Sequence, residues 1–116
     1  MTVKGALKAR EAGAAAIVVS NHGGRVLDQC PATAEVLPEI AAALKGTDVK
    51  VLVDGGIRTG VDVFKALALG ADGVLICRPF VTAVYGGGAE GRQGRAWRRS
   101  SRHPCFRWRP DRKSVV

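Results

Sequence analysis

The stretch AAAIVVS (residues 14–20), which runs directly into NHGGR (residues 21–25), decides the fold of this chain. An unbroken apolar run rich in Ile and Val is typical of a strand that is buried on both faces in a parallel sheet. The loop that follows is loosened by two glycines and carries an imidazole, His22, and a guanidinium, Arg25, three positions apart. The guanidinium of such a pair can bind a small anion, and the imidazole can accept or donate that anion's proton.

Helices and strands alternate on both sides of this stretch. Strong helix formers predict a first helix over 4–12, which Gly13 should end. Further helices are expected over 33–45, with a kink at Pro38, and over 60–69, with further strands over 50–54 and 73–77. Thr59 and Asp62 are spaced as a capping box, and Pro79 suits the first turn of a last helix.

The order α-β-α-β-α-β predicts right-handed βαβ units and a parallel sheet, and so an α/β fold. Residues 8–19 and 65–76 also resemble each other at a constant offset of 57 residues, because a helix that ends in Gly-Ala precedes a buried strand in both. This repeat favours a (β/α)8 TIM barrel over a doubly wound sheet. A full barrel takes about 250 residues, so this chain of 116 residues would hold only part of one.

The net charge of +8 is unevenly spread along the chain. Residues 1–91 hold nine basic and nine acidic side chains, whereas residues 92–116 hold nine basic and one acidic. Cys30, Cys77 and Cys105 have no metal-ligand spacing, so no metal site is expected. No secretory leader follows the first residue, and no apolar run approaches the roughly 20 residues of a membrane span. We therefore expect a cytoplasmic protein.

Polar residues follow each of the three expected strands, at the edge where barrels carry their chemistry. Glycines that let backbone N–H groups approach, together with arginines that donate in pairs, predict a phosphate subsite there. The residues of this edge are His22, Arg25, Asp54, Gly55, Gly56, Arg58 and Arg78.

Plainer interpretations of these residues remain open at this point. His22 could be a solvated turn residue, and Asp54 could be a structural cap at the end of its strand. Arg58 could pair with Asp62, and Arg78, which precedes a proline, could lie on the surface.

Three blocks in the chain resemble the FMN-dependent 2-hydroxy acid oxidases and dehydrogenases. They are residues 20–28, residues 54–71 and Arg78-Pro79, in the order and spacing of that family. The family includes glycolate oxidase, lactate oxidase and flavocytochrome lactate dehydrogenase. The resemblance covers about residues 1–91 and implies the C-terminal part of an incomplete (β/α)8 barrel, about strands 6–8.

The resemblance implies FMN as cofactor and oxidation of a small L-2-hydroxy acid, of the lactate or glycolate type, to the 2-oxo acid. His22 would be the base that takes a proton from the substrate while a hydride equivalent reaches the flavin, and Arg25 would pair with the substrate carboxylate. Full-length relatives are expected to be homo-oligomers. The cofactor-binding residues implied are Ser20, Asp54, Gly55, Gly56, Ile57, Arg58, Cys77 and Arg78.

The chain departs from the family pattern in three places. The lysine that faces the flavin in the family would fall, by register, before Met1. The family usually has glycine where Cys77 stands. Residues 92–116 do not continue the pattern and look like a basic, non-native tail that should be disordered. Because three barrel strands leave two open edges, we expect the chain alone to be unstable and inactive.

Two other functions compete with this interpretation. Another FMN barrel, such as a type 2 isopentenyl diphosphate isomerase or the glutamate synthase barrel, would share the phosphate subsite, but residues 21–25 suit a hydroxy acid better. A nucleic-acid-binding function would rest on arginines that alternate with Trp97, Phe106 and Trp108. That segment contains no recognisable motif, so no nucleic-acid partner is expected.

Overall fold

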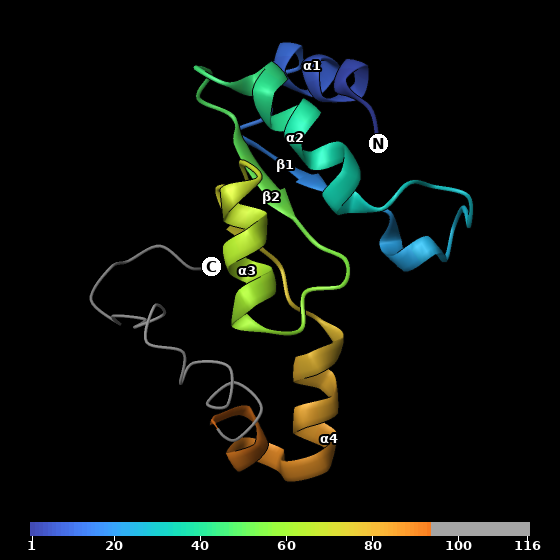
Figure 1. Cartoon of the computed structure of the whole chain (residues 1–116), viewed down its shortest axis with the longest axis vertical. Coiled ribbons are helices and arrows are strands. Elements are labelled where there is room, and N and C mark those ends of the chain that lie inside the picture. The colour runs from blue at the N-terminus through green and yellow to red at the C-terminus, as the bar shows by residue number, and fades with distance from the viewer. Residues whose placement is uncertain (94–116) are drawn as a thin grey trace.

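The computed structural model describes residues 1–93, and the basic tail expected over 92–116 lies outside the described residues from position 94 on. Figure 1 shows helices and strands alternating along the chain, as the sequence predicts. The elements are α1 (Val3–Glu11), β1 (Ala16–Val19), the short 3-10 helix η1 (His22–Gly24), α2 (Thr33–Leu44), β2 (Lys50–Val53), α3 (Gly60–Ala68), β3 (Gly73–Val74) and α4 (Arg78–Gln93).

The three strands form one parallel sheet in the order β1-β2-β3. Val19 pairs with Val53, and Val53 pairs with Val74, so the strands end at the same edge. Helices join consecutive strands, which confirms the predicted α/β fold with parallel strands. The loops that follow the three strands therefore all lie at the carboxyl end of the sheet.

The core lies between the sheet and α2. Val19, Val51 and Val53 point to this side and are almost fully buried, and Leu37 and Ile40 of α2 pack against them. Apolar burial of this kind is the main stabilising contribution to the fold. The core thus fixes α2 on the sheet and, with it, the start of α2 beside the strand ends.

Burial of the strands on both faces, expected from their apolar sequence, is wrong for β1. Val18 is 47% exposed while its neighbour Val19 is 2% exposed. Val18 pairs with Leu52 of β2, which lies on the same face of the sheet. None of the described helices covers Val18, so this face of the sheet is open at β1.

The last two elements also differ from expectation. β3 covers only Gly73–Val74 rather than 73–77, although the N–H of Leu75 still donates to the carbonyl of Val53 at 2.9 Å. The ladder stops there because β2 ends at Val53. α4 extends to Gln93 and includes a non-helical Gly88. The predicted helix over 33–45 is present as α2, which contains Pro38.

Within residues 1–93, none of the helices has the length and apolar character that a membrane crossing requires. In the same range, no group of three or more His, Cys, Asp or Glu side chains is placed to hold a metal ion.

Candidate functional site

The loop after β1 is held in shape by its own side chains. Ser20 Oγ accepts a hydrogen bond from the N–H of His22 at 3.1 Å, and Asn21 Oδ1 accepts one from the N–H of Gly23 at 2.9 Å. His22 has φ 54°, and it is the only non-glycine residue in the described part of the chain with a positive φ. A left-handed histidine is uncommon, and such strain concentrates at functional sites.

His22 and Arg25 both project from this loop with exposed side chains. Neither the imidazole nor the guanidinium makes a hydrogen bond or ion pair with another described residue. A base and a cation on one short loop are therefore available to a ligand that approaches the carboxyl end of the sheet.

The exit of β2 lies next to this loop. The N–H of Asp54 donates to the carbonyl of Val19 at 3.2 Å, which fastens the two strand ends together. Gly55 and Gly56 follow with φ 90° and 79°, in the left-handed region that glycine adopts freely. The chain turns sharply here and presents backbone rather than side chains.

Asp54 carries an unsatisfied atom at this edge. Its Oδ1 is buried and has no hydrogen-bond partner among the described residues. Buried carboxylate oxygens in folded proteins are almost always hydrogen-bonded, so an orphaned one indicates a missing donor. A ligand with hydroxyl groups, such as the ribityl chain of FMN, would supply that donor.

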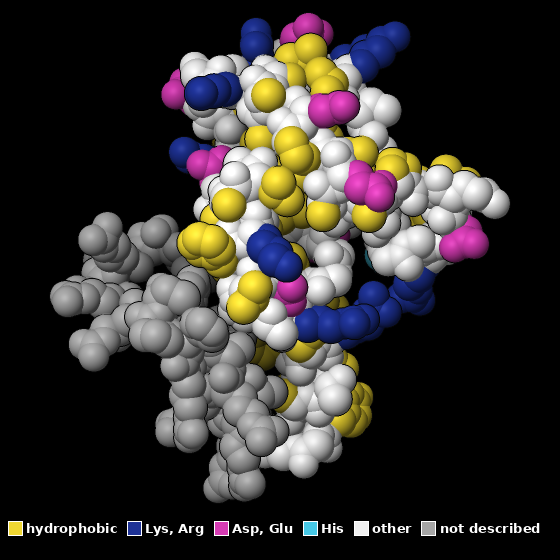
Figure 2. All heavy atoms as spheres, in the orientation of Figure 1, with side chains coloured by type: hydrophobic (Ala, Val, Ile, Leu, Met, Phe, Trp, Pro, Cys, Tyr) yellow, Lys and Arg dark blue, Asp and Glu magenta, His cyan; other side chains and the backbone are white. Residues whose placement is uncertain are grey.

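Arg78, at the exit of β3, reaches across to the loop after β1. A Cβ placed on Gly23 would lie 3.3 Å from Nη2 of Arg78 and 4.0 Å from its Cζ. The guanidinium thus lies against the backbone of Gly23, where a larger residue would press on it. Figure 2 shows Lys and Arg side chains gathered between α4 and the loop after β1.

Arg58 stands on the same side with an exposed side chain, but it does not pair with Asp62 as the plainer interpretation held. The Asp62 carboxylate instead accepts the backbone N–H groups of Arg58 at 3.1 Å and Thr59 at 2.8 Å. With the N–H of Asp62 donating to Thr59 Oγ1 at 3.3 Å, this is the predicted capping box. Hydrogen bonds to its carboxylate hold the pKa of Asp62 below its ordinary value. The Thr59 hydroxyl contributes most, and the N–H groups of Arg58 and Thr59 add to it.

The two remaining predicted residues lie at the edge of the site. Ile57 is half-buried and packs against the core cluster. Cys77 has an exposed, free thiol, and its carbonyl accepts the N–H groups of Phe80 and Val81 at the start of α4. Its backbone therefore anchors the helix that carries Arg78.

Sequence reasoning missed Thr33 and gave no role to Asn21. Thr33 is 5% exposed, and its hydroxyl donates to the carbonyl of Asp54 at 2.7 Å. The one available signal was a threonine at the start of a helix that follows a strand-exit loop.

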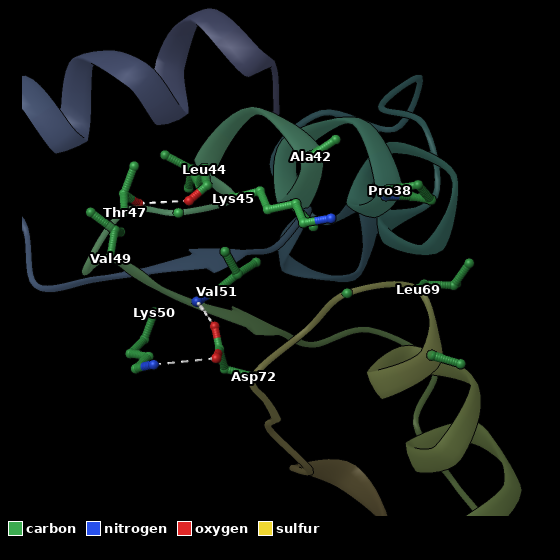
Figure 3. A pocket seen from close by; sticks show the side chains of 14 residues that line it. Pro38, Ala42, Leu44, Lys45, Thr47, Val49, Lys50, Val51, Leu69 and Asp72 are labelled. Carbon is green, nitrogen blue, oxygen red and sulfur yellow. Dashed lines mark hydrogen bonds and ion pairs between the residues drawn. The ribbon is translucent and has the colours of Figure 1, made fainter.

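A cavity lies at the amino ends of the strands, opposite the candidate site. It holds about 430 Å³ between the C-terminal ends of α2 and α3 and the start of β2 (Figure 3). Lys50 and Asp72 pair there at 3.5 Å, and the N–H of Val51 donates to Asp72 at 2.8 Å. Because parallel α/β proteins bind ligands at the carboxyl ends of their strands, we assign no catalytic role to this cavity.

The chain is an α/β protein whose parallel strands bring a histidine, several arginines and two left-handed glycines to the carboxyl end of its sheet. The family model described as FMN-dependent dehydrogenase matches residues 1–96. The chain belongs to this family.

Among its relatives, the peroxisomal (S)-2-hydroxyacid oxidase GLO4 of Arabidopsis thaliana is 58% identical over 94 residues, which are 81% of this chain and 25% of that protein. The L-lactate oxidase of Lactobacillus jensenii is 55% identical over 95 residues, 77% of this chain and 23% of that protein. A structure of mandelate oxidase with benzoyl-formic acid matches with a TM-score of 0.77 and 53% identity, over 80% of this chain and 28% of that one. The chain spans about a quarter of the length of these relatives.

Proposed function

We propose that this chain forms about strands 6–8 of a (β/α)8 barrel that binds FMN and oxidises a small L-2-hydroxy acid to the 2-oxo acid. The observation that carries the proposal is the meeting of three strand exits. The Arg78 guanidinium lies against Gly23, and the orphaned Asp54 Oδ1 belongs to the exit between them. Family membership and the names of the relatives support the same chemistry.

The residues at this edge suit the parts of FMN. Asp54 Oδ1 would accept a hydrogen bond from a ribityl hydroxyl, and Arg58 and Arg78 would pair with the phosphate. Gly56 leaves its backbone open to the phosphate and ribityl groups, since a Cβ placed on it would meet nothing within 4 Å. When bound, FMN supplies the acceptor for the electrons that leave the substrate.

His22 and Arg25 would act on the substrate. The Arg25 guanidinium binds the planar carboxylate with two parallel hydrogen bonds and so orients the neighbouring carbon. The His22 imidazole takes the proton of the 2-hydroxyl group, as a side chain that changes charge between pH 5 and 8 can do. Ser20 Oγ and Asn21 Oδ1 accept hydrogen bonds from the N–H groups of His22 and Gly23 and so fix the backbone that carries the imidazole.

Residues 21–25 and the family match favour a hydroxy acid over the substrate of a type 2 isopentenyl diphosphate isomerase. Cytoplasmic location and assembly into homo-oligomers stay predictions, as do the domain boundary at residue 91 and the inactivity of the isolated chain.

The test is a barrel chimera, in which residues 1–91 replace the matching segment of the mandelate oxidase. We expect the chimera to bind FMN and to oxidise lactate, glycolate or mandelate. His22→Gln should lower kcat by a factor of about 10² to 10⁴ and leave FMN bound, the range that general-base catalysis contributes. Lys45→Gln, in the cavity at the opposite edge, is the matched control and should change neither property.

A chimera that retains full turnover after His22→Gln would refute the assignment of the base. A chimera that folds without binding FMN would refute the cofactor site.

A further inference from the structure

The side chain of Asn21 joins both ends of the loop that carries the proposed base. Its Oδ1 accepts from the N–H of Gly23 at 2.9 Å, and its Nδ2 donates to the carbonyl of Pro31 at 3.4 Å. The first contact lies directly beside His22, and the second lies two residues before Thr33. Asn21 therefore links the strained part of the loop to the start of α2.

Thr33 continues this link to the exit of β2. Its hydroxyl is buried and donates to the carbonyl of Asp54 at 2.7 Å, across 21 positions in the sequence. A Cβ placed on Gly55 would lie 3.1 Å from Thr33 Oγ1 and 3.8 Å from Asn21 Oδ1. The two polar side chains thus converge on the backbone of Gly55.

We propose that Asn21 and Thr33 are positioning residues that lock the His22 loop onto the Asp54 exit and so fix the base relative to the cofactor subsite. The inference rests on the proposed function, because that function makes His22 the base and Asp54 part of the cofactor site. The physical ground is the left-handed backbone of His22, which persists only where its surroundings over-determine it. Neither side chain need touch substrate or cofactor for this role.

Thr33 offers a matched pair of variants. Thr33→Val keeps the shape and removes the hydrogen bond to Asp54, whereas Thr33→Ser keeps the hydroxyl. In the barrel chimera, we expect Thr33→Val to lower kcat/KM about tenfold, and Thr33→Ser to stay within about twofold of the parent. Both kcat and KM are expected to change in Thr33→Val, because Arg25 lies on the same loop as His22.

Asn21 offers a second pair with a readout that needs no FMN. Asn21→Ala removes the acceptor for the N–H of Gly23, and Asn21→Asp keeps it. Amide exchange at Gly23, measured on the FMN-free barrel chimera, should accelerate about tenfold in Asn21→Ala and remain near the parent rate in Asn21→Asp.

The outcomes separate the two proposals. An inactive parent chimera refutes the proposed function, while the exchange rates still decide whether Asn21 holds the loop. An active chimera in which Thr33→Val and Thr33→Ser behave alike refutes the positioning role of Thr33. Unchanged Gly23 exchange in Asn21→Ala refutes that of Asn21.

Discussion

Replacement of Gly70 by alanine tests how tightly α3 is packed against α2. Gly70 follows α3 with φ 103°, and a Cβ on it would lie 2.7 Å from the Cβ of Ala41. Two costs then combine. The left-handed backbone costs an L-residue roughly 1–2 kcal/mol, and forcing an extra methyl group against the Ala41 Cβ costs typically about 1–3 kcal/mol. We expect Gly70→Ala to destabilise the fold by about 2–5 kcal/mol, a large part of the stability of a small domain.

Gly13 provides a matched control, because it ends α1 as Gly70 ends α3. It has φ 86°, and a Cβ on it would meet nothing within 4 Å. Gly13→Ala should therefore cost only the backbone part, roughly 1–2 kcal/mol. The difference between the two variants measures the contact with Ala41.

Ala41→Gly removes the other half of that contact. Alone, it should cost about 1 kcal/mol through the lower helix propensity of glycine. Combined with Gly70→Ala, it should recover about 1–3 kcal/mol, which a double-mutant cycle reports as coupling.

Unfolding of the FMN-free barrel chimera in urea, followed by far-UV circular dichroism, supplies these free energies. Equal losses in Gly70→Ala and Gly13→Ala, or a double variant with no recovery, would show that Gly70 does not lie against Ala41.

Three further predictions concern charged groups. Hydrogen bonds, chiefly from the Thr59 hydroxyl, hold the pKa of Asp62 in the folded protein below its ordinary value of 3.8. The Asp62 carboxylate should therefore stabilise α3 fully above pH 3.8, and this contribution should be lost as the pH falls through the lowered pKa. An acid titration followed by circular dichroism should show this loss in the parent and not in Asp62→Asn. In urea unfolding, Lys50→Met should cost less than about 0.5 kcal/mol, because the ion pair of Lys50 with Asp72 is exposed. Asp72→Ala should cost about 1–3 kcal/mol, because it leaves the N–H of Val51 in β2 unpaired. Equal losses in the two variants would contradict this difference. In the barrel chimera, Arg78→Ala should raise the Kd for FMN about tenfold to hundredfold and leave riboflavin, which lacks the phosphate, unaffected; a parallel loss for riboflavin would place Arg78 elsewhere.

Local signals in the sequence were sufficient to place the helices. The capping box at Thr59 and Asp62 and the terminating Gly13 act over three or four residues, and the structure shows both. The burial of β1 could not be predicted in the same way. Whether Val18 is covered depends on segments that pack against the open face, and an apolar run looks the same with one covered face or two.

The gathering of His22, Asp54 and Arg78 follows from a rule of topology, since parallel strands deliver their following loops to one edge. The hydrogen bond from Thr33 to Asp54 does not follow from any rule, because its acceptor is a backbone carbonyl that leaves no mark in the sequence. For the same reason, the Arg58 backbone rather than its guanidinium turned out to face Asp62.

The hydrogen bonds that shape the candidate site do not depend on the open face of the sheet at Val18. The bonds that shape the site, from the N–H of Asp54 to Val19, from the Thr33 hydroxyl to Asp54 and from the N–H of Gly23 to Asn21, all lie within the described residues. Hydrogen bonds of this kind need no cover over Val18 to form. Expelling water from around the reacting atoms strengthens the electrostatic interactions of an active site. His22 is exposed within the described residues, so these residues supply the geometry of the site but no shielding of the base from water.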